Sequence, residues 1–184
     1  MKYKREFEIA FVGLKPGIHT FNYNIDDSFF EKFEKPEFNQ AKIDINLSLD
    51  KKSNIFLLIF KINGKVNIAC DRCGDEFELT LWDEFELVVK IVDDSLVEKK
   101  SELDAEVAYI GHSESILRIE KLIYEFVILS IPMQHIHLDD ENGQSTCNPI
   151  ALKFLNQNNS NQQSTIWEKL KTNKKLKIKT IRYA

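Results

Sequence analysis

The sequence predicts an α+β fold: a mostly antiparallel β-sheet, or a partly open barrel, fills the N-terminal two-thirds, and C-terminal helices pack on it. Of the 184 residues, 43% are hydrophobic and 29% are charged, which is typical of a globular chain with a sizeable core. Apolar and polar residues alternate from Ile43 to Leu49, as in a strand with one buried face. Between residues 115 and 130, apolar side chains recur at helical spacing instead.

The first 40 residues predict two strands and a short helix. The apolar side chains of residues 7–11 repeat at every second position, and a similar alternation extends over residues 18–25. Asp26 or Asp27 follows, and either carboxylate can accept hydrogen bonds from the first N–H groups of a helix through Phe33. An α+β chain that begins with an antiparallel pair fits this pattern.

The middle of the chain predicts further strands joined by tight turns. Residues 55–62 are apolar on both faces, which indicates a central strand. The dipeptide Asn63-Gly64 is typical of a two-residue hairpin turn, and a strand leading into Cys70 follows it. Residues 77–92 are rich in β-branched and aromatic side chains and predict one long strand. The segment after Cys70 is therefore expected at a hairpin tip.

The C-terminal third predicts a short strand and two helices. A strand is expected over residues 103–110, and a helix over residues 115–130 with Ser113 or Ser115 as its cap. Asn148 and Pro149 suit the cap and the first turn of the second helix.

The composition predicts that the chain divides into two parts, a domain and a C-terminal segment. Residues 1–155 are expected to form a single domain. Residues 156–184 are expected to form a polar linker, a short helix around Trp167 and a basic tail.

Three cysteines and two neighbouring histidines predict a metal site. Cys70 and Cys73 are spaced so that both thiolates can hold one ion from a single turn. Cys147 lies far downstream, near His135 and His137, and a structural zinc takes four such ligands in a tetrahedron. We expect His137 to be the fourth ligand, because His135 lies closer to the helix end at residue 132, and we keep His135 as the alternative.

Other interpretations of the cysteines are plain packing, a redox pair and a catalytic metal. A thioredoxin-like pair is expected at a strand-to-helix junction, whereas a strand follows Cys73 here. A zinc-dependent hydrolase would need an open metal position and a nearby base, for which Asp75 and Glu76 are the available carboxylates. The sequence contains no glycine-rich phosphate loop, no Gly-x-Ser-x-Gly and no His-Glu-x-x-His. We therefore do not expect an enzyme.

The sequence also indicates in which cellular compartment the protein is found. No apolar run approaches the 18–20 residues, roughly, that a membrane helix needs. An odd number of cysteines argues against a secreted disulfide framework. We expect a cytoplasmic protein without a membrane partner or a small-molecule substrate.

Charge is unevenly distributed along the chain. Residues 71–106 contain thirteen acidic and four basic side chains, whereas residues 166–184 contain seven basic side chains and one acidic one. The pattern is typical of a protein that contacts a polyanion with one part only. The candidate nucleic-acid contacts in the tail are Lys171, Lys174, Lys175, Lys177, Lys179 and Arg182. A solubilising terminus is the alternative interpretation.

Four separated segments together resemble a known family. They are CDRCG at 70–74, IYEFVILSIPMQHIH at 123–137, CNPIALKFL at 147–155 and TIWEKLK at 165–171. This set resembles the YceD-like family, named for accumulation of the large ribosomal RNA subunit and described as metal-binding and nucleic-acid-binding.

The resemblance implies a non-enzymatic ribosome-biogenesis factor that supports synthesis, processing or accumulation of 23S ribosomal RNA. The implied partners are ribosomal RNA or a large-subunit precursor particle. The acidic segment 71–106 would suit a basic ribosomal protein as a further partner.

Overall fold

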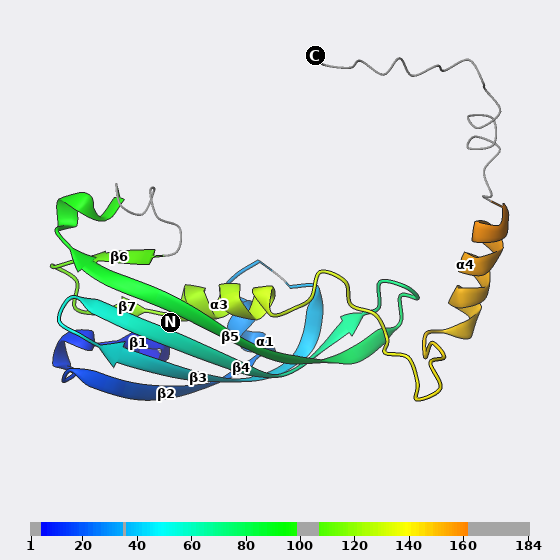
Figure 1. Cartoon of the computed structure of the whole chain (residues 1–184), viewed down its shortest axis with the longest axis horizontal. Coiled ribbons are helices and arrows are strands. Elements are labelled where there is room, and N and C mark those ends of the chain that lie inside the picture. Colours follow the sequence, from blue (N-terminus) through cyan, green and yellow to red (C-terminus); the bar gives the residue numbers. More distant parts are fainter. Residues whose placement is uncertain (1–4, 35, 99–106, 162–184) are drawn as a thin grey trace, which may run out of the picture. The chain divides into compact units, whose positions relative to one another are not determined.

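The computed structural model describes residues 5–34, 36–98 and 107–161, with the backbone alone for residues 158–161 (Figure 1). The chain divides into two compact units. The first comprises residues 1–70 and 76–135, and the second comprises 71–75 and 136–184.

The first unit is built on a five-stranded sheet with the strand order β2-β3-β4-β5-β6. Neighbouring strands from β2 to β5 are antiparallel, while β6 runs parallel to β5. A separate antiparallel pair joins β1 to β7. The bounds are β1 Glu8–Ile9, β2 Gly17–Asp26, β3 Phe38–Lys51, β4 Ile55–Ala69, β5 Glu76–Val92, β6 Val107–Gly111 and β7 Leu117–Arg118.

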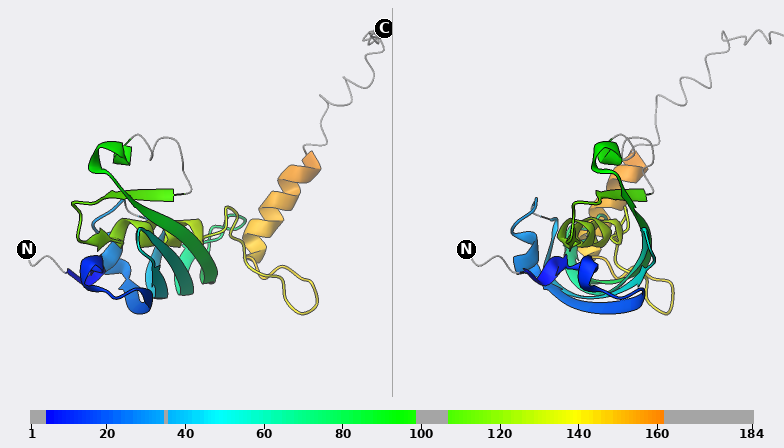
Figure 2. Two further views of the ribbon diagram at one scale, coloured as in Figure 1. Left: turned by 60° about the vertical axis from the view of Figure 1, so that its left-hand side comes forward. Right: turned by 90° about the vertical axis from the view of Figure 1, so that its left-hand side faces the viewer.

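The predicted α+β class is confirmed, with a mixed and mostly antiparallel sheet. In the described part of the chain the sheet has β2 and β6 as its two edges and does not close into a barrel. Figure 2 shows it as a curved sheet with α3 lying on the concave side. The helices are α1 Asp27–Phe30, α3 Glu120–Leu129 and α4 Pro149–Asn161. Short 3-10 turns are η1 Arg5–Phe7, η2 Phe11–Gly13 and η3 Asp94–Leu96.

The core lies between the sheet and α3. Alternation on β3 buries Ile43, Ile45, Leu47 and Leu49 to within 2% of full burial, as their spacing predicts. From the helix, Phe126 packs its ring against Phe60 and Phe85, with centroid separations of 5.0 and 4.7 Å. Aromatic contacts of this kind add to the area that they bury, so they fix where α3 meets the sheet.

Asp26 caps the short helix α1, in agreement with the sequence. Its carboxylate accepts a hydrogen bond from the Ser28 N–H at 3.0 Å. The helix ends at Phe30, short of the predicted end at Phe33. The Phe33 ring instead stacks on Tyr124 of α3, at 4.4 Å and 15°. A tertiary contact thus replaces the last predicted turn.

The prediction of a hairpin turn at Asn63-Gly64 is wrong. Both residues lie inside β4, which is continuous from Ile55 to Ala69. A Cβ at Gly64 would lie 2.4 Å from the Lys42 carbonyl oxygen and 2.7 Å from the Ile43 Cα, beside a bulge in β3. The glycine is therefore required because two backbones approach closely, which is the other common role of glycine in a strand.

Two predicted element boundaries also differ. Within residues 7–11, only the two residues of β1 form a strand, and the 3-10 turns η1 and η2 flank it. The alternating apolar side chains of this segment are nevertheless buried, as expected. The helix predicted from residue 115 begins at Glu120, and its cap position is Ile119, which makes no side-chain cap. Residues 117 and 118 pair with β1 instead, so the cap assignment to Ser113 or Ser115 is wrong.

The remaining predictions for these segments have mixed outcomes. The strand expected over residues 103–110 corresponds to β6 from residue 107, and residues 103–106 lie outside the described part. The boundary at residue 155 stays a prediction, and α4 extends to Asn161. Among the described residues, no helix combines the length and the apolar composition that a membrane span requires.

Candidate metal centre

The first half of the candidate site is the connection between β4 and β5. Ala69 pairs with Glu76, so the six residues between them form the hairpin tip that the sequence predicts. Gly74 has φ +79°, in the left-handed region where only glycine is unstrained. This turn lets the chain reverse directly after Cys73 and keeps both cysteines on the same tip.

The second half is the loop between residues 136 and 148, within the second unit. A bridge pairs Asp139 with Ser145 and closes a small hairpin. Inside it, the Asp140 carboxylate accepts hydrogen bonds from the Asn142 and Gln144 N–H groups at 2.9 and 2.7 Å. Gly143, with φ +74°, provides the reversal. The folded loop brings Cys147 back to His137, ten residues earlier in the chain.

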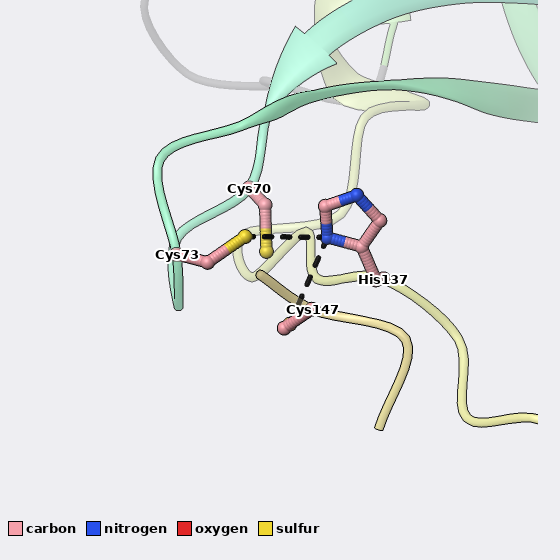
Figure 3. A group of neighbouring side chains, drawn as sticks. All are labelled: Cys70, Cys73, His137 and Cys147. Carbon is pink, nitrogen blue, oxygen red and sulfur yellow. Dashed lines mark hydrogen bonds between the residues drawn. The ribbon is translucent and has the colours of Figure 1, made fainter. Parts of the chain in front are cut away.

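Figure 3 shows the side chains of Cys70, Cys73, His137 and Cys147 pointing toward one another. Their ligand atoms all lie within 4.8 Å of one another. The His137 Nδ1 lies 3.5 Å from the Cys73 Sγ and 3.7 Å from the Cys147 Sγ. Cys70 and Cys147 are buried, and the other two are partly buried. The structure thus brings together the four residues that the sequence proposes as ligands.

The separations fit one shared ion. A tetrahedral zinc with Zn–S of about 2.3 Å and Zn–N of about 2.0–2.1 Å holds a sulfur and a nitrogen donor about 3.6 Å apart. The two S–N separations in this cluster, 3.5 and 3.7 Å, lie on either side of that value. A neutral imidazole carries at most one proton on Nδ1, so Nδ1 cannot donate a separate hydrogen bond to each of the two sulfurs. A metal ion bound by Nδ1 and both sulfurs explains the two short distances better. Three thiolates and an imidazole are a common structural zinc set.

Comparison with known proteins places these residues in a family. The family model described as "Large ribosomal RNA subunit accumulation protein YceD" matches residues 58–173. The chain belongs to the YceD family. The matched region contains both halves of the cluster, from Cys70 to Cys147. No curated protein and no solved structure gave a significant match.

In this YceD-family chain, polar contacts hold the two halves of the site together. The Arg72 guanidinium, from the residue between the two cysteines, donates to the Ser145 Oγ at 2.8 Å and lies 4.0 Å from the Asp139 carboxylate. The same Ser145 Oγ accepts from the Cys147 N–H at 3.3 Å. Arg72 is thus linked to the backbone of a proposed ligand through one hydroxyl. Sequence reasoning did not identify Arg72 or Ser145, because their roles depend on loops 73 residues apart.

Asn148 makes a second connection within the second unit. Its side-chain amide donates to the Asp75 carboxylate at 3.0 Å. Its side-chain oxygen accepts from the Ile150 N–H at 2.9 Å, which confirms Asn148 as the cap of α4. One side chain therefore fixes the helix start and ties it to the cysteine turn.

The other predicted site residues lie elsewhere. The His135 Nδ1 lies 3.4 Å from the Pro132 carbonyl oxygen, and His135 is not part of the four-residue cluster. The six basic residues proposed for nucleic-acid binding, Lys171 to Arg182, fall outside the described residues. Their role stays a prediction.

Proposed function

We propose that this protein is a non-enzymatic factor that supports the accumulation of large-subunit (23S) ribosomal RNA, with a structural zinc in the Cys/His cluster. The observation that carries the proposal is the family match over residues 58–173, whose description names accumulation of the large ribosomal RNA subunit. The match covers the cysteine turn, the folded loop and α4 together. The family match therefore includes the region that contains the candidate metal centre.

The donor set supports a structural rather than a catalytic ion. Cys70, Cys73, His137 and Cys147 would fill a tetrahedral shell and leave no position for a reacting water. Zinc supplies folding free energy in such sites, commonly several kcal/mol or more, because the ligands cannot be held together in the unfolded chain. In this chain it would keep the cysteine turn and the loop of residues 136–148 in their folded arrangement. A zinc-dependent hydrolase, in contrast, would need one of the four to leave the metal.

The proposed partners are ribosomal RNA or a large-subunit precursor particle, together with a basic ribosomal protein. The lysine-rich tail supports contact with phosphates, which would depend strongly on salt concentration. Three free cysteines that belong to one candidate metal site suit a reducing compartment, so we also propose a cytoplasmic location.

The test is to remove the protein from cells that make it and to quantify 23S relative to 16S ribosomal RNA. We expect a lower ratio, restored by the wild-type chain. Complementation with His137→Ala should fail or be partial, whereas His135→Ala should restore the ratio, since only His137 belongs to the cluster. An unchanged ratio after complete removal of the protein would refute the proposed role, and equal complementation by both variants would refute the need for the metal.

A further inference from the structure

The face of the sheet opposite α3 carries one strongly exposed tryptophan. Trp82 stands on β5, and 78% of its surface is exposed. It faces Asn63 on β4, and its same-face neighbours along β5 are Thr80 and Glu84. These short or polar neighbours give the indole little apolar surface to pack on. Trp82 therefore contributes little to the core of the first unit, whereas its neighbour Leu81 on the other face is 2% exposed.

Carboxylates flank Trp82 along the same face of β5. Glu84 and Glu86 follow it at intervals of two residues, and Glu78 and Glu76 precede it on the far side of Thr80; all four are exposed. Residues two apart in a strand project from one face at a spacing of about 6.8 Å. We call Trp82 with these four glutamates the Trp82 face.

Lysines on β4 neutralise only part of this charge. Lys61 pairs with Glu84 at 3.1 Å and Lys65 pairs with Glu78 at 2.7 Å, and the side chains of both pairs are 42% exposed or more. Exposed pairs of this kind are weak and exchange readily for other partners. By strand alternation from β2 to β5, this side of the sheet carries seven carboxylates and four lysines: Asp26, Asp44, Asp50, Glu76, Glu78, Glu84 and Glu86 against Lys42, Lys61, Lys65 and Lys90.

We propose that the Trp82 face docks an extended basic segment of a partner protein, with Arg or Lys at alternate positions. An extended peptide projects alternate side chains at the same spacing as β5, so its cations can meet Glu84 and Glu86 while another lies over Trp82. An arginine on an indole gains cation–π attraction, and tryptophan is among the residues that most often dominate an interface. The surplus of carboxylates repels RNA, which makes a basic protein the fitting occupant.

This inference concerns a peptide surface and does not rest on the role in ribosomal RNA accumulation. The test uses the full chain and a fluorescently labelled ten-residue peptide of alternating Arg and Thr, with binding followed by anisotropy at 50 mM salt. We expect saturable binding that weakens at 300 mM salt, because exposed charges are screened. Trp82→Ala should weaken binding about tenfold, as is typical of a central interface residue. Trp82→Phe should retain part of the affinity.

Matched controls separate the Trp82 face from general charge and general aromaticity. Phe154→Ala removes another exposed aromatic side chain, 64% exposed on α4, and should leave binding unchanged. The double variant Glu84→Gln/Glu86→Gln should weaken binding, whereas Glu98→Gln/Glu114→Gln, with the same loss of charge at exposed positions elsewhere, should not. Equal weakening by the two double variants would overturn the proposal. So would an unchanged affinity of Trp82→Ala whose circular dichroism matches the wild type.

Two further outcomes identify a different occupant. In the first, the variant chain has glutamine in place of Lys174, Lys175, Lys177 and Lys179. If this variant binds the peptide at least tenfold more tightly, the chain's own tail competes for the Trp82 face. Loss of single-stranded RNA binding in Trp82→Ala would show that the face binds RNA. Either result would overturn docking of a basic partner segment.

Discussion

Replacing His137 by alanine tests the candidate metal centre most directly. The imidazole Nδ1 lies 3.5 and 3.7 Å from two sulfurs, so its loss removes one of four candidate donors without touching the sheet core. Structural zinc sites bind with about 10–16 kcal/mol of apparent free energy. An equal share per donor is about 3 kcal/mol, or about a hundredfold in affinity. A water that replaces the imidazole recovers part of this, so we expect a loss of about 10- to 100-fold.

The assay is zinc content after purification without chelator, followed by competition with a chromophoric chelator at pH 7.5. His135→Ala is the matched control, since His135 is two residues away and outside the cluster. We expect one zinc per wild-type chain and per control chain, and weaker retention by His137→Ala. Zinc held equally well by His137→Ala and by Cys147→Ser would refute the four-ligand geometry. Loss of zinc in His135→Ala alone would show that the other histidine is the ligand.

Two further predictions concern the first unit. Gly64→Ala should lower the free energy of unfolding by about 2 kcal/mol or more, because its Cβ would lie 2.4 Å from a backbone oxygen. Urea unfolding measures this loss, and the control variant Asn63→Ala should show no comparable one. Equal losses in the two variants would contradict the close approach of β3 and β4. Burial, with a smaller contribution from Glu6, raises the pKa of Tyr23 to about 12. The unfolded chain, with a tyrosine pKa near 10, releases its proton first as pH rises, so stability is full below about pH 10 and falls between about pH 10 and 12, by up to about 2–3 kcal/mol. Unfolding midpoints across this range should fall less for Tyr23→Phe; parallel curves for the two proteins would contradict it.

Local pattern was sufficient for much of the sheet. The two-residue alternation of Ile43 to Leu49 predicts which side of β3 is buried, because a strand places successive side chains on opposite faces. The boundaries of the helices and strands were harder to predict, because one residue type can have different structural roles. A glycine after asparagine suits a turn, but at Gly64 it permits close packing against β3 within one continuous strand. Nothing next to it in the sequence distinguishes these two roles.

Donor chemistry and folding each decided part of the metal centre. Residue types and spacing alone predicted Cys70 and Cys73 as half of a candidate metal site, with Cys147 and a nearby histidine as partners, because few side chains bind zinc and a Cys-x-x-Cys turn positions two of them. The sequence favoured His137 and left His135 as the alternative; the tertiary structure places His137 and not His135 in the cluster, and only the tertiary structure shows that Arg72 supports it. Those choices depend on how the loop after residue 136 folds back on the turn after β4. Such contacts between distant segments leave no periodicity in the sequence, since they arise from three-dimensional distance and not from spacing along the chain.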